Sequence, residues 1–273
     1  MAQEGSNNVV FAKGLSRAFG GALIFSLPIF LTGETWWLGF YIDRVRLMLL
    51  LIVLLPMLAC ISYFVGFKET TDWKSDVLDA FVAYGVGVIT ASVILPLLSI
   101  VQLNMSLNEI VGKIAIQAVP ASIGAVHAGG QFGVQRRKTQ DKRQKTGYIG
   151  ELFIMGVGAL FLALNLAPIR ELVMLAHIVT WSQAAILVVL SLLVMQAFAY
   201  GIDRQHAPDG RVPIFASFVR MTMAGYAVSL AISLFMLWSF ARTDGMATPQ
   251  VVRTLIVLTF PASIGAAASR VIL

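Results

Sequence analysis

Long runs of apolar residues, each about the length that crosses a bilayer, follow one another along almost the whole chain. A helix that spans the hydrocarbon core needs about 20 mostly apolar residues. The runs that meet this length are Ala18–Phe40, Leu47–Gly66, Val77–Val101, Ile110–Ala128, Tyr148–Pro168, Thr180–Gly201, Val212–Phe240 and Val251–Leu273. The stretch from Leu152 to Gly201 is too long for one span and suits two spans joined by a tight turn. The pattern therefore predicts an all-α polytopic membrane protein with eight transmembrane helices.

One hexapeptide occurs twice along this pattern. The sequence PASIGA fills positions 120–125 and again positions 261–266, at an offset of 141 (from Pro120 to Pro261). An identical segment at a fixed offset is the signature of an internal duplication. Two further pairs, Glu34 with Glu171 and Tyr84 with Tyr226, align at the similar offsets of 137 and 142 (171 minus 34 and 226 minus 84).

The duplication predicts two repeats of four helices, at 17–130 and 147–273, joined by a linker at 131–146. A repeat with an even number of spans returns the chain to its starting side. The two repeats should therefore be parallel and related by a pseudo-twofold axis along the membrane normal. The linker is strongly basic and contains Arg136, Arg137, Lys138, Lys142, Arg143 and Lys145. The positive-inside rule places this linker and both termini in the cytoplasm, although Arg44 and Arg46 then fall outside.

Composition explains why the surroundings must be lipid. Hydrophobic residues make up 58% of the 273 residues and charged residues only 12%, whereas soluble domains carry about 25% charged residues. The net charge of +6 comes without a nucleic-acid-binding motif. The single cysteine, Cys60, excludes an intramolecular disulfide. Because no hydrolase, metalloprotease, phosphate-binding or dinucleotide-binding motif is present, we expect neither an enzyme nor a cofactor.

Two carboxylates, Glu34 and Glu171, occupy equivalent places after helices that contain a proline (Pro28 and Pro168). Charged residues within apolar segments are expensive and are candidates for ion pathways. Together the two carboxylates could bind a proton or a cation such as Ca²⁺, which prefers oxygen ligands. The alternatives are structural: Glu34 could pair with Lys113 and Glu171 with Arg253, or each carboxylate could simply lie at the water interface.

The repeated hexapeptide offers a second candidate site. Pro120 and Pro261 should break the helix ladder and free the carbonyls four residues earlier, and Ser122 and Ser263 lie beside them. These groups could line a pore and bind an ion. The alternative is a kinked packing interface that uses the neighbouring small residues. Gln117 lies in the first of these helices but aligns with Leu258, which argues against a symmetric filter.

A third pair of charges lies towards the predicted cytoplasmic side. Asp79 and Arg220 lie early in the third and seventh predicted helices, and they could form an ion pair across the pseudo-twofold axis. Arg220 could instead extend to the inner headgroups. Three histidines, His127, His177 and His206, share no metal-ligand spacing, so the sequence identifies no metal site.

The apolar run up to Glu34, the stretch NLAPIRE at Asn165–Glu171 and the two PASIGA segments together resemble an uncharacterised family of bacterial integral membrane proteins. The resemblance covers nearly the whole chain. It implies a location in the bacterial inner membrane and an unknown activity, and it carries no catalytic or binding residue over to this chain.

These observations favour an ion channel or transporter for cations, with Ca²⁺ or H⁺ preferred and the pathway between the two repeats. An anion channel stays open because Lys113, Arg170, Arg220 and Arg253 are also in or near the membrane. A structural or assembly protein without transport activity is the third hypothesis. The expected partners are the lipid bilayer and an inorganic ion, and the sequence is compatible with a homo-oligomer.

Overall fold

The computed structural model describes residues 2–65, 73–102, 104–131, 147–206, 215 and 218–272, and this part of the chain is helical with connecting turns. The chain divides into two compact units, Met1–Lys145 and Thr146–Leu273. Of the predicted basic linker at 131–146, only Gln131 belongs to the described residues.

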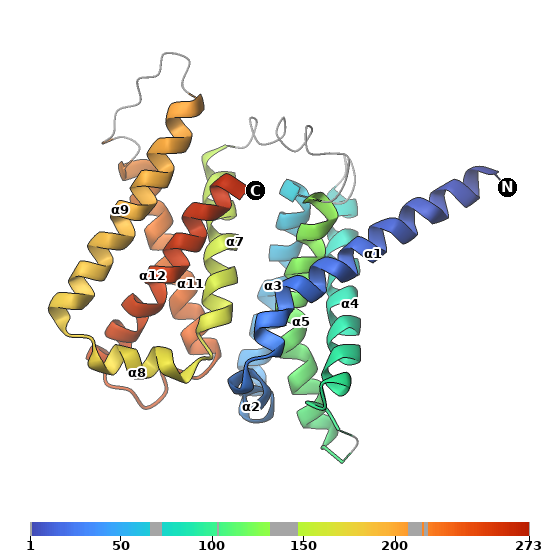
Figure 1. Ribbon diagram of the computed structural model, residues 1–273, viewed down its shortest axis with the longest axis horizontal. Helices are drawn as coiled ribbons and strands as arrows, with labels where there is room; N and C mark the ends of the chain where they lie inside the picture. Colours follow the sequence, from blue (N-terminus) through green and yellow to red (C-terminus); the bar gives the residue numbers. More distant parts are fainter. Residues whose placement is uncertain are drawn as a thin grey trace. The chain divides into compact units, whose positions relative to one another are not determined.

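The first unit is built around its last helix. Its elements are α1 (Ala2–Phe30), α2 (Gly33–Tyr41), α3 (Arg44–Val65), α4 (Trp73–Leu97) and α5 (Leu107–Gln131). Helix α5 packs against all four of the others (Figure 1). Helix α1 begins at Ala2, well before the predicted span that starts at Ala18.

The second unit also has a short helix after its first helix. It contains α7 (Tyr148–Leu166), α8 (Arg170–Ile178), α9 (Trp181–His206), the π-helix η1 (Phe218–Met223), α11 (Ala224–Ser239) and α12 (Thr248–Ile272). Helix α12 packs against α7, α8, α9 and α11. In Figure 1 the short helix α8 runs across the ends of α7 and α9.

The number of spans agrees with the sequence pattern at a coarser level. Seven of the described helices are long and apolar enough to cross a membrane, and α1 with α2 would make an eighth. However, α1 and α2 meet at a bend of 87°, so the predicted span Ala18–Phe40 is broken after Phe30. The tight turn predicted between the fifth and sixth spans is likewise replaced by the helix α8.

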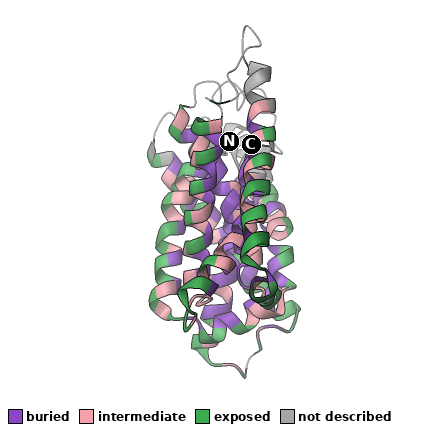
Figure 2. Ribbon diagram, turned by 90° about the vertical axis from the view of Figure 1, so that its left-hand side faces the viewer, coloured by how far each residue is buried: buried purple, intermediate pink, exposed green. Residues whose placement is uncertain are grey.

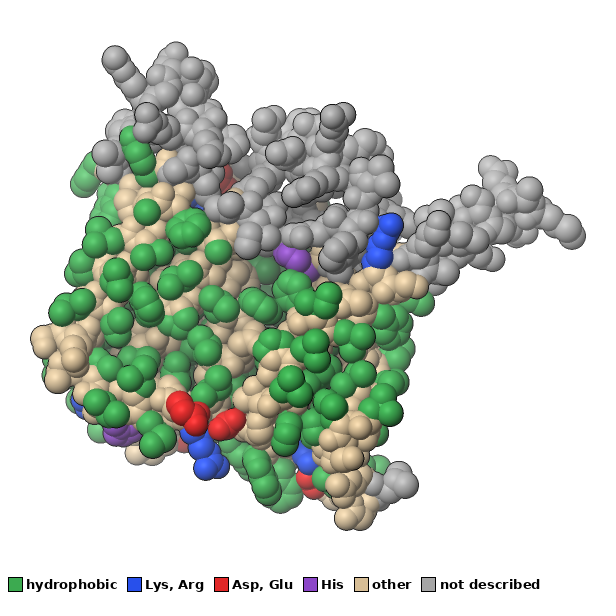
Figure 3. All heavy atoms as spheres, in the orientation of Figure 1, with side chains coloured by type: hydrophobic (Ala, Val, Ile, Leu, Met, Phe, Trp, Pro, Cys, Tyr) green, Lys and Arg blue, Asp and Glu red, His purple; other side chains and the backbone are tan. Residues whose placement is uncertain are grey.

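The outward faces of the helices are apolar, as expected for a protein whose solvent is lipid. Large hydrophobic side chains such as Ile52, Phe81 and Leu193 are exposed. Figure 2 shows buried and exposed residues on opposite sides of the same helices, and on the face drawn in Figure 3 hydrophobic side chains predominate. A polar solvent would make so much exposed apolar surface unfavourable.

The glycines of the repeated hexapeptide allow two helix backbones to approach closely. A methyl group added to Gly124 on α5 would overlap the carbonyl oxygen of Gly21 on α1. In the second unit, the same substitution at Gly265 on α12 would overlap the carbonyl oxygen of Gly158 on α7. Small residues are what membrane helices use for such contacts. The geometry therefore supports the packing interpretation of PASIGA.

Candidate functional site

The candidate site lies at the elbow between α1 and α2, where the last carbonyls of α1 need partners that the helix itself cannot supply. Side chains from the following residues supply them. The bonds are Thr32 Oγ1 to Pro28 O (2.6 Å), Thr35 Oγ1 to Ile29 O (2.9 Å) and Trp36 Nε1 to Phe30 O (2.7 Å). This capping allows the chain to bend by 87° within an apolar stretch without leaving these carbonyls unpaired.

Gln117 joins this elbow from the neighbouring helix α5. Its side chain is only 1% exposed, and Nε2 donates to Thr35 Oγ1 at 2.9 Å and to Ile29 O at 3.4 Å. The single hydroxyl proton of Thr35 is shared between Ile29 O and Thr32 O, and Thr32 O lies 2.7 Å from Oγ1. The carbonyl oxygen of the same amide, Gln117 Oε1, is buried and has no hydrogen-bond partner among the described residues. Buried acceptors of this kind are uncommon, and each requires an explanation.

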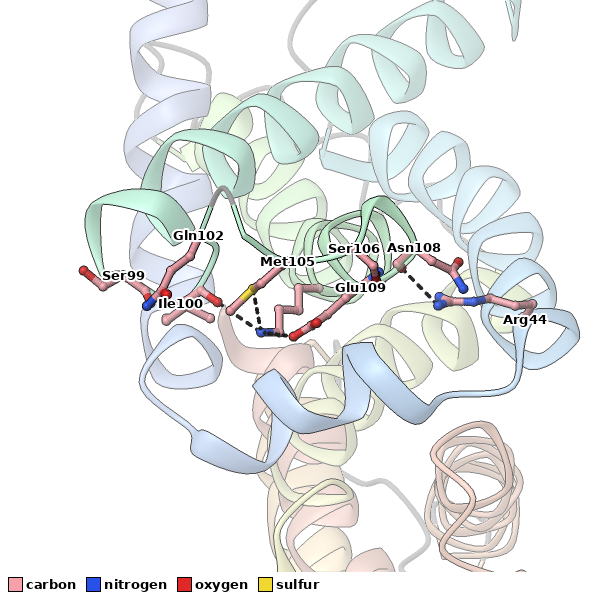
Figure 4. A network of polar contacts seen from close by, with 9 residues as sticks. Arg44, Ser99, Ile100, Gln102, Met105, Ser106, Asn108 and Glu109 are labelled. Atoms are coloured by element: carbon pink, nitrogen blue, oxygen red, sulfur yellow. Dashed lines mark hydrogen bonds and ion pairs between the residues drawn. The ribbon is translucent and has the colours of Figure 1, made fainter.

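Lys113 lies one turn before Gln117 on α5. An ion pair and hydrogen bonds with other residues, which are labelled in Figure 4, satisfy its ammonium group. Its ammonium group contacts Glu109 Oε1 at 2.7 Å, Ile100 O at 3.1 Å and Met105 Sδ at 3.4 Å. All three donors of the ammonium group are therefore used, although the residue is only 7% exposed. The structure pairs Lys113 with Glu109 rather than with Glu34. The spacing of four residues between Glu109 and Lys113 is the signal that the sequence analysis missed.

Glu34 and Glu171 occupy the first turns of the short helices α2 and α8. Negative charge in the first turn interacts favourably with the helix dipole, which is a structural reason for an acid at both positions. Glu34 is half-buried, whereas Glu171 is exposed. Arg253 donates to Val179 O at 3.3 Å and its guanidinium carbon lies 5.6 Å from the Trp181 ring centre. Its pairing with Glu171 stays a prediction.

The elbow of the second unit, between α7 and α8, carries a positive charge. The guanidinium group of Arg242, which follows α11, donates to Pro168 O at this elbow. Nearby in the sequence, Asn165 Nδ2 donates to Phe161 O at 2.7 Å, and Asn165 Oδ1 has no partner among the described residues. Arg242 could not be identified from the sequence pattern, because its only signal is a basic residue just after an apolar run.

The prolines and serines of the hexapeptide lie inside continuous helices. Pro120 is within α5 and Pro261 within α12. The hydroxyls of Ser122 and Ser263 are fully buried, and each donates to a backbone carbonyl earlier in its own helix, at 2.6 and 2.7 Å. A role of these four residues in binding an ion stays a prediction.

The opposite end of the second unit contains an ion pair that the sequence analysis also missed. Arg270 is 4% exposed and contacts Glu151 at 2.9 Å. At the same end Arg220 lies 5.1 Å from the ring centre of Tyr148, whose hydroxyl donates to Arg220 O at 2.9 Å. Asp79 is half-buried on α4 of the first unit. Its pairing with Arg220 would join the two units and stays a prediction.

Within the described ranges, no group of three or more His, Cys, Asp or Glu side chains could hold a metal ion.

Comparisons with known proteins identify the family of the chain. Residues 14–273 match the family described as "Putative integral membrane protein (DUF2391)". No curated protein and no solved structure matches the chain. The chain therefore belongs to the DUF2391 family of integral membrane proteins.

Proposed function

We propose that this protein moves inorganic cations across the membrane, as a channel or a transporter. The observation that carries the proposal is the elbow of the first unit, where a first helix breaks and buried uncharged oxygens gather around Gln117. Transporters bind their ions at such discontinuous helices, because the freed backbone carbonyls can replace water. Polar groups buried in a membrane protein are expensive, so a functional role is the first hypothesis for them.

We also propose that the two units are repeats that arose by duplication. Three kinds of equivalence support this: α5 and α12 have the same length of 25 residues; a left-handed residue with φ 58° follows both α4 and α11, at Ser99 and Ala241; and the same glycine contact joins the first and last helices of each unit. With eight crossings, both termini would lie on one side, the cytoplasmic side by the positive-inside rule, in a bacterial inner membrane.

In this proposal Glu34 and Glu171 lie at the outer ends of the units and attract cations electrostatically towards the pathway. Acidic groups at the mouth of a pathway raise the local cation concentration and are screened by salt. The hexapeptide contributes through Gly124 and Gly265, which hold the last helix of each unit against the first. Such packing would keep the elbow fixed while ions pass.

A second candidate is an anion pathway, and a specific observation favours it. The Nε groups of Arg242 and Arg253 are buried, and neither has an acceptor among the described residues. Both residues belong to the second unit, and a partly unsatisfied guanidinium group is a natural ligand for an anion. This hypothesis competes with the cation pathway. An anion pathway would conduct Cl⁻ and a cation pathway would not, so ion selectivity distinguishes the two.

Ion flux into liposomes that contain the purified protein separates these hypotheses. A panel of Ca²⁺, K⁺, Na⁺, H⁺ and Cl⁻ should show faster entry of at least one cation than in protein-free liposomes, with Cl⁻ unchanged. Faster entry of Cl⁻ alone would replace the proposal with the anion pathway. Entry rates equal to those of protein-free liposomes for every ion would favour a structural or assembly role. The variant Gly124→Ala, which alters helix packing, should lower the flux, whereas Gly85→Ala, whose added methyl group has nothing within 4 Å, should leave it unchanged and serves as the control.

A further inference from the structure

We propose that the elbow of the first unit is a binding site for one dehydrated monovalent alkali cation, formed by Gln117, Thr35 and the carbonyl of Ile29. The inference deepens the cation pathway proposed above by naming the site and the class of ion. It can be tested without transport, because binding to a purified protein does not require flux.

Three oxygen atoms lie close together here, and Gln117 Oε1 is the fourth that could join them. Thr35 Oγ1 lies 2.9 Å from Ile29 O and 2.7 Å from Thr32 O, and the amide of Gln117 contacts the same hydroxyl. Gln117 Nε2 now occupies the place between Thr35 Oγ1 and Ile29 O, where it supplies the positive end of an N–H dipole. A half turn of the amide would bring the unpartnered Oε1 into that place. A cation that entered between Oε1, Thr35 Oγ1 and Ile29 O, with the side chains moving apart to admit it, would have hydroxyl and carbonyl oxygens as its ligands.

The charges around the elbow favour a monovalent ion. None of the four oxygens belongs to a carboxylate, whereas sites for Ca²⁺ rely on several acidic ligands. Lys113, one turn away on α5, is held by Glu109 at 2.7 Å, so this pair contributes little net charge. Rings of neutral carbonyl oxygens are what selective sites for alkali cations use in place of the hydration shell.

The second unit provides the matched comparison. At the offsets of the sequence repeat, Thr35 aligns with Leu172 (offset 137) and Gln117 with Leu258 (offset 141), so the polar cluster is absent from those positions. In the second unit the guanidinium group of Arg242 donates to Pro168 O, so a side chain of the protein places a positive charge at this elbow. In the first unit the donors to the elbow carbonyls are the neutral groups of Thr32, Thr35, Trp36 and Gln117. The second elbow therefore has a positively charged side chain as a donor, whereas the first elbow has only neutral donors.

Thermal unfolding of the purified full-length protein in detergent tests the site. The measurement compares sodium, potassium and choline chloride at constant ionic strength. Sodium or potassium should raise the melting temperature of the wild-type protein by at least about 2 °C over choline, because a ligand that binds only the folded state stabilises it. The variant Gln117→Leu, which copies Leu258 of the second unit, should lose this rise.

Three controls keep the test decisive. Thr35→Val should also lose the rise, whereas Thr35→Ser retains the hydroxyl and should keep it. Gln196→Leu removes the buried contact between Gln196 and Thr222 in the second unit, at 2.7 Å, and should keep the rise as well. Equal melting temperatures in all three salts would overturn the cation site, whether or not the protein conducts ions. A rise without any flux in liposomes would leave the site standing and overturn the transport function alone.

Discussion

Gln117 on α5 reaches Thr35 on α2, with 2.9 Å between Nε2 and Oγ1, although 82 residues separate them in the chain. The contact fixes the last helix of the first unit to the elbow at which its first helix breaks. Because both side chains are almost fully buried, the bond forms in surroundings of low dielectric constant, where hydrogen bonds are strong and unpaired groups are costly. The elbow is thus a rigid, polar point within an apolar bundle.

The close helix contacts of the hexapeptide predict a strong effect of one methyl group. Gly124→Ala and Gly265→Ala should each lower the free energy of unfolding by about 1–3 kcal/mol, because the new methyl group would overlap a backbone carbonyl. Gly85→Ala in α4 is the matched control, since no atom lies within 4 Å of its added methyl group. Thermal unfolding in detergent measures all three. A control as unstable as the two hexapeptide variants would show that close packing is not the cause.

The partner of Lys113 predicts which acid matters for stability. Glu109→Gln should lower the free energy of unfolding by about 1–3 kcal/mol, because it weakens an ion pair of 2.7 Å in which Lys113 is buried and Glu109 half-buried. Glu34→Gln should change stability by less than about 0.5 kcal/mol, since Glu34 does not contact Lys113. The double variant Glu109→Gln with Lys113→Gln should recover part of the loss. If Glu34→Gln were the more damaging single change, the assignment of partners would be incorrect.

The proposed topology predicts that one position on each of the short helices α2 and α8, which follow the two elbows, is accessible in intact cells. Trp37 on α2 and Met174 on α8 are 65% and 64% exposed. In the proposed eight-span topology an even number of crossings would separate them. In a Cys60→Ser background, Trp37→Cys and Met174→Cys should both react with an impermeant maleimide from outside. Gln140→Cys, in the basic linker, should react only after the membrane is disrupted. Labelling at only one of the two elbow helices would contradict the eight-span topology.

Hydropathy predicted most of the helices because lipid requires long apolar segments and because backbone polar groups must be paired within them. The predicted span Leu47–Gly66, for example, corresponds to α3 at Arg44–Val65. The elbow was not predicted, since its break at Leu31 and Thr32 lies within an apolar run. What ends α1 there is capping by side chains, including Gln117 from a distant helix, and no local pattern contains that information.

The candidate site was predicted only in part, for a related reason. Glu34, Lys113 and Gln117 were all recognised as polar residues of apolar segments, and a pair of Lys113 with Glu34 was one of the alternatives. The structure prefers Glu109, which lies on the same face of α5 one turn away and needs no long-range arrangement. Local spacing was therefore the better guide to ion pairs, whereas the convergence of Gln117 with Thr35 required the tertiary fold.

The two equivalent carboxylates predict an effect on transport that is separate from folding. Glu34→Gln and Glu171→Gln should each lower cation flux several-fold at low salt while leaving the melting temperature nearly unchanged, because they attract ions at the helix ends. High salt should remove most of the difference, since it screens the attraction. Flux that is unchanged in the double variant at low salt would assign both residues to helix capping alone.

The most direct test of the account is the rate at which a cation gradient dissipates across liposomes that contain the wild-type protein. The account predicts faster dissipation than in protein-free liposomes prepared in the same way, and a slower rate for the Gln117→Leu variant at equal protein content. Dissipation at the protein-free rate, for Na⁺, K⁺, Ca²⁺ and H⁺ alike, would contradict it.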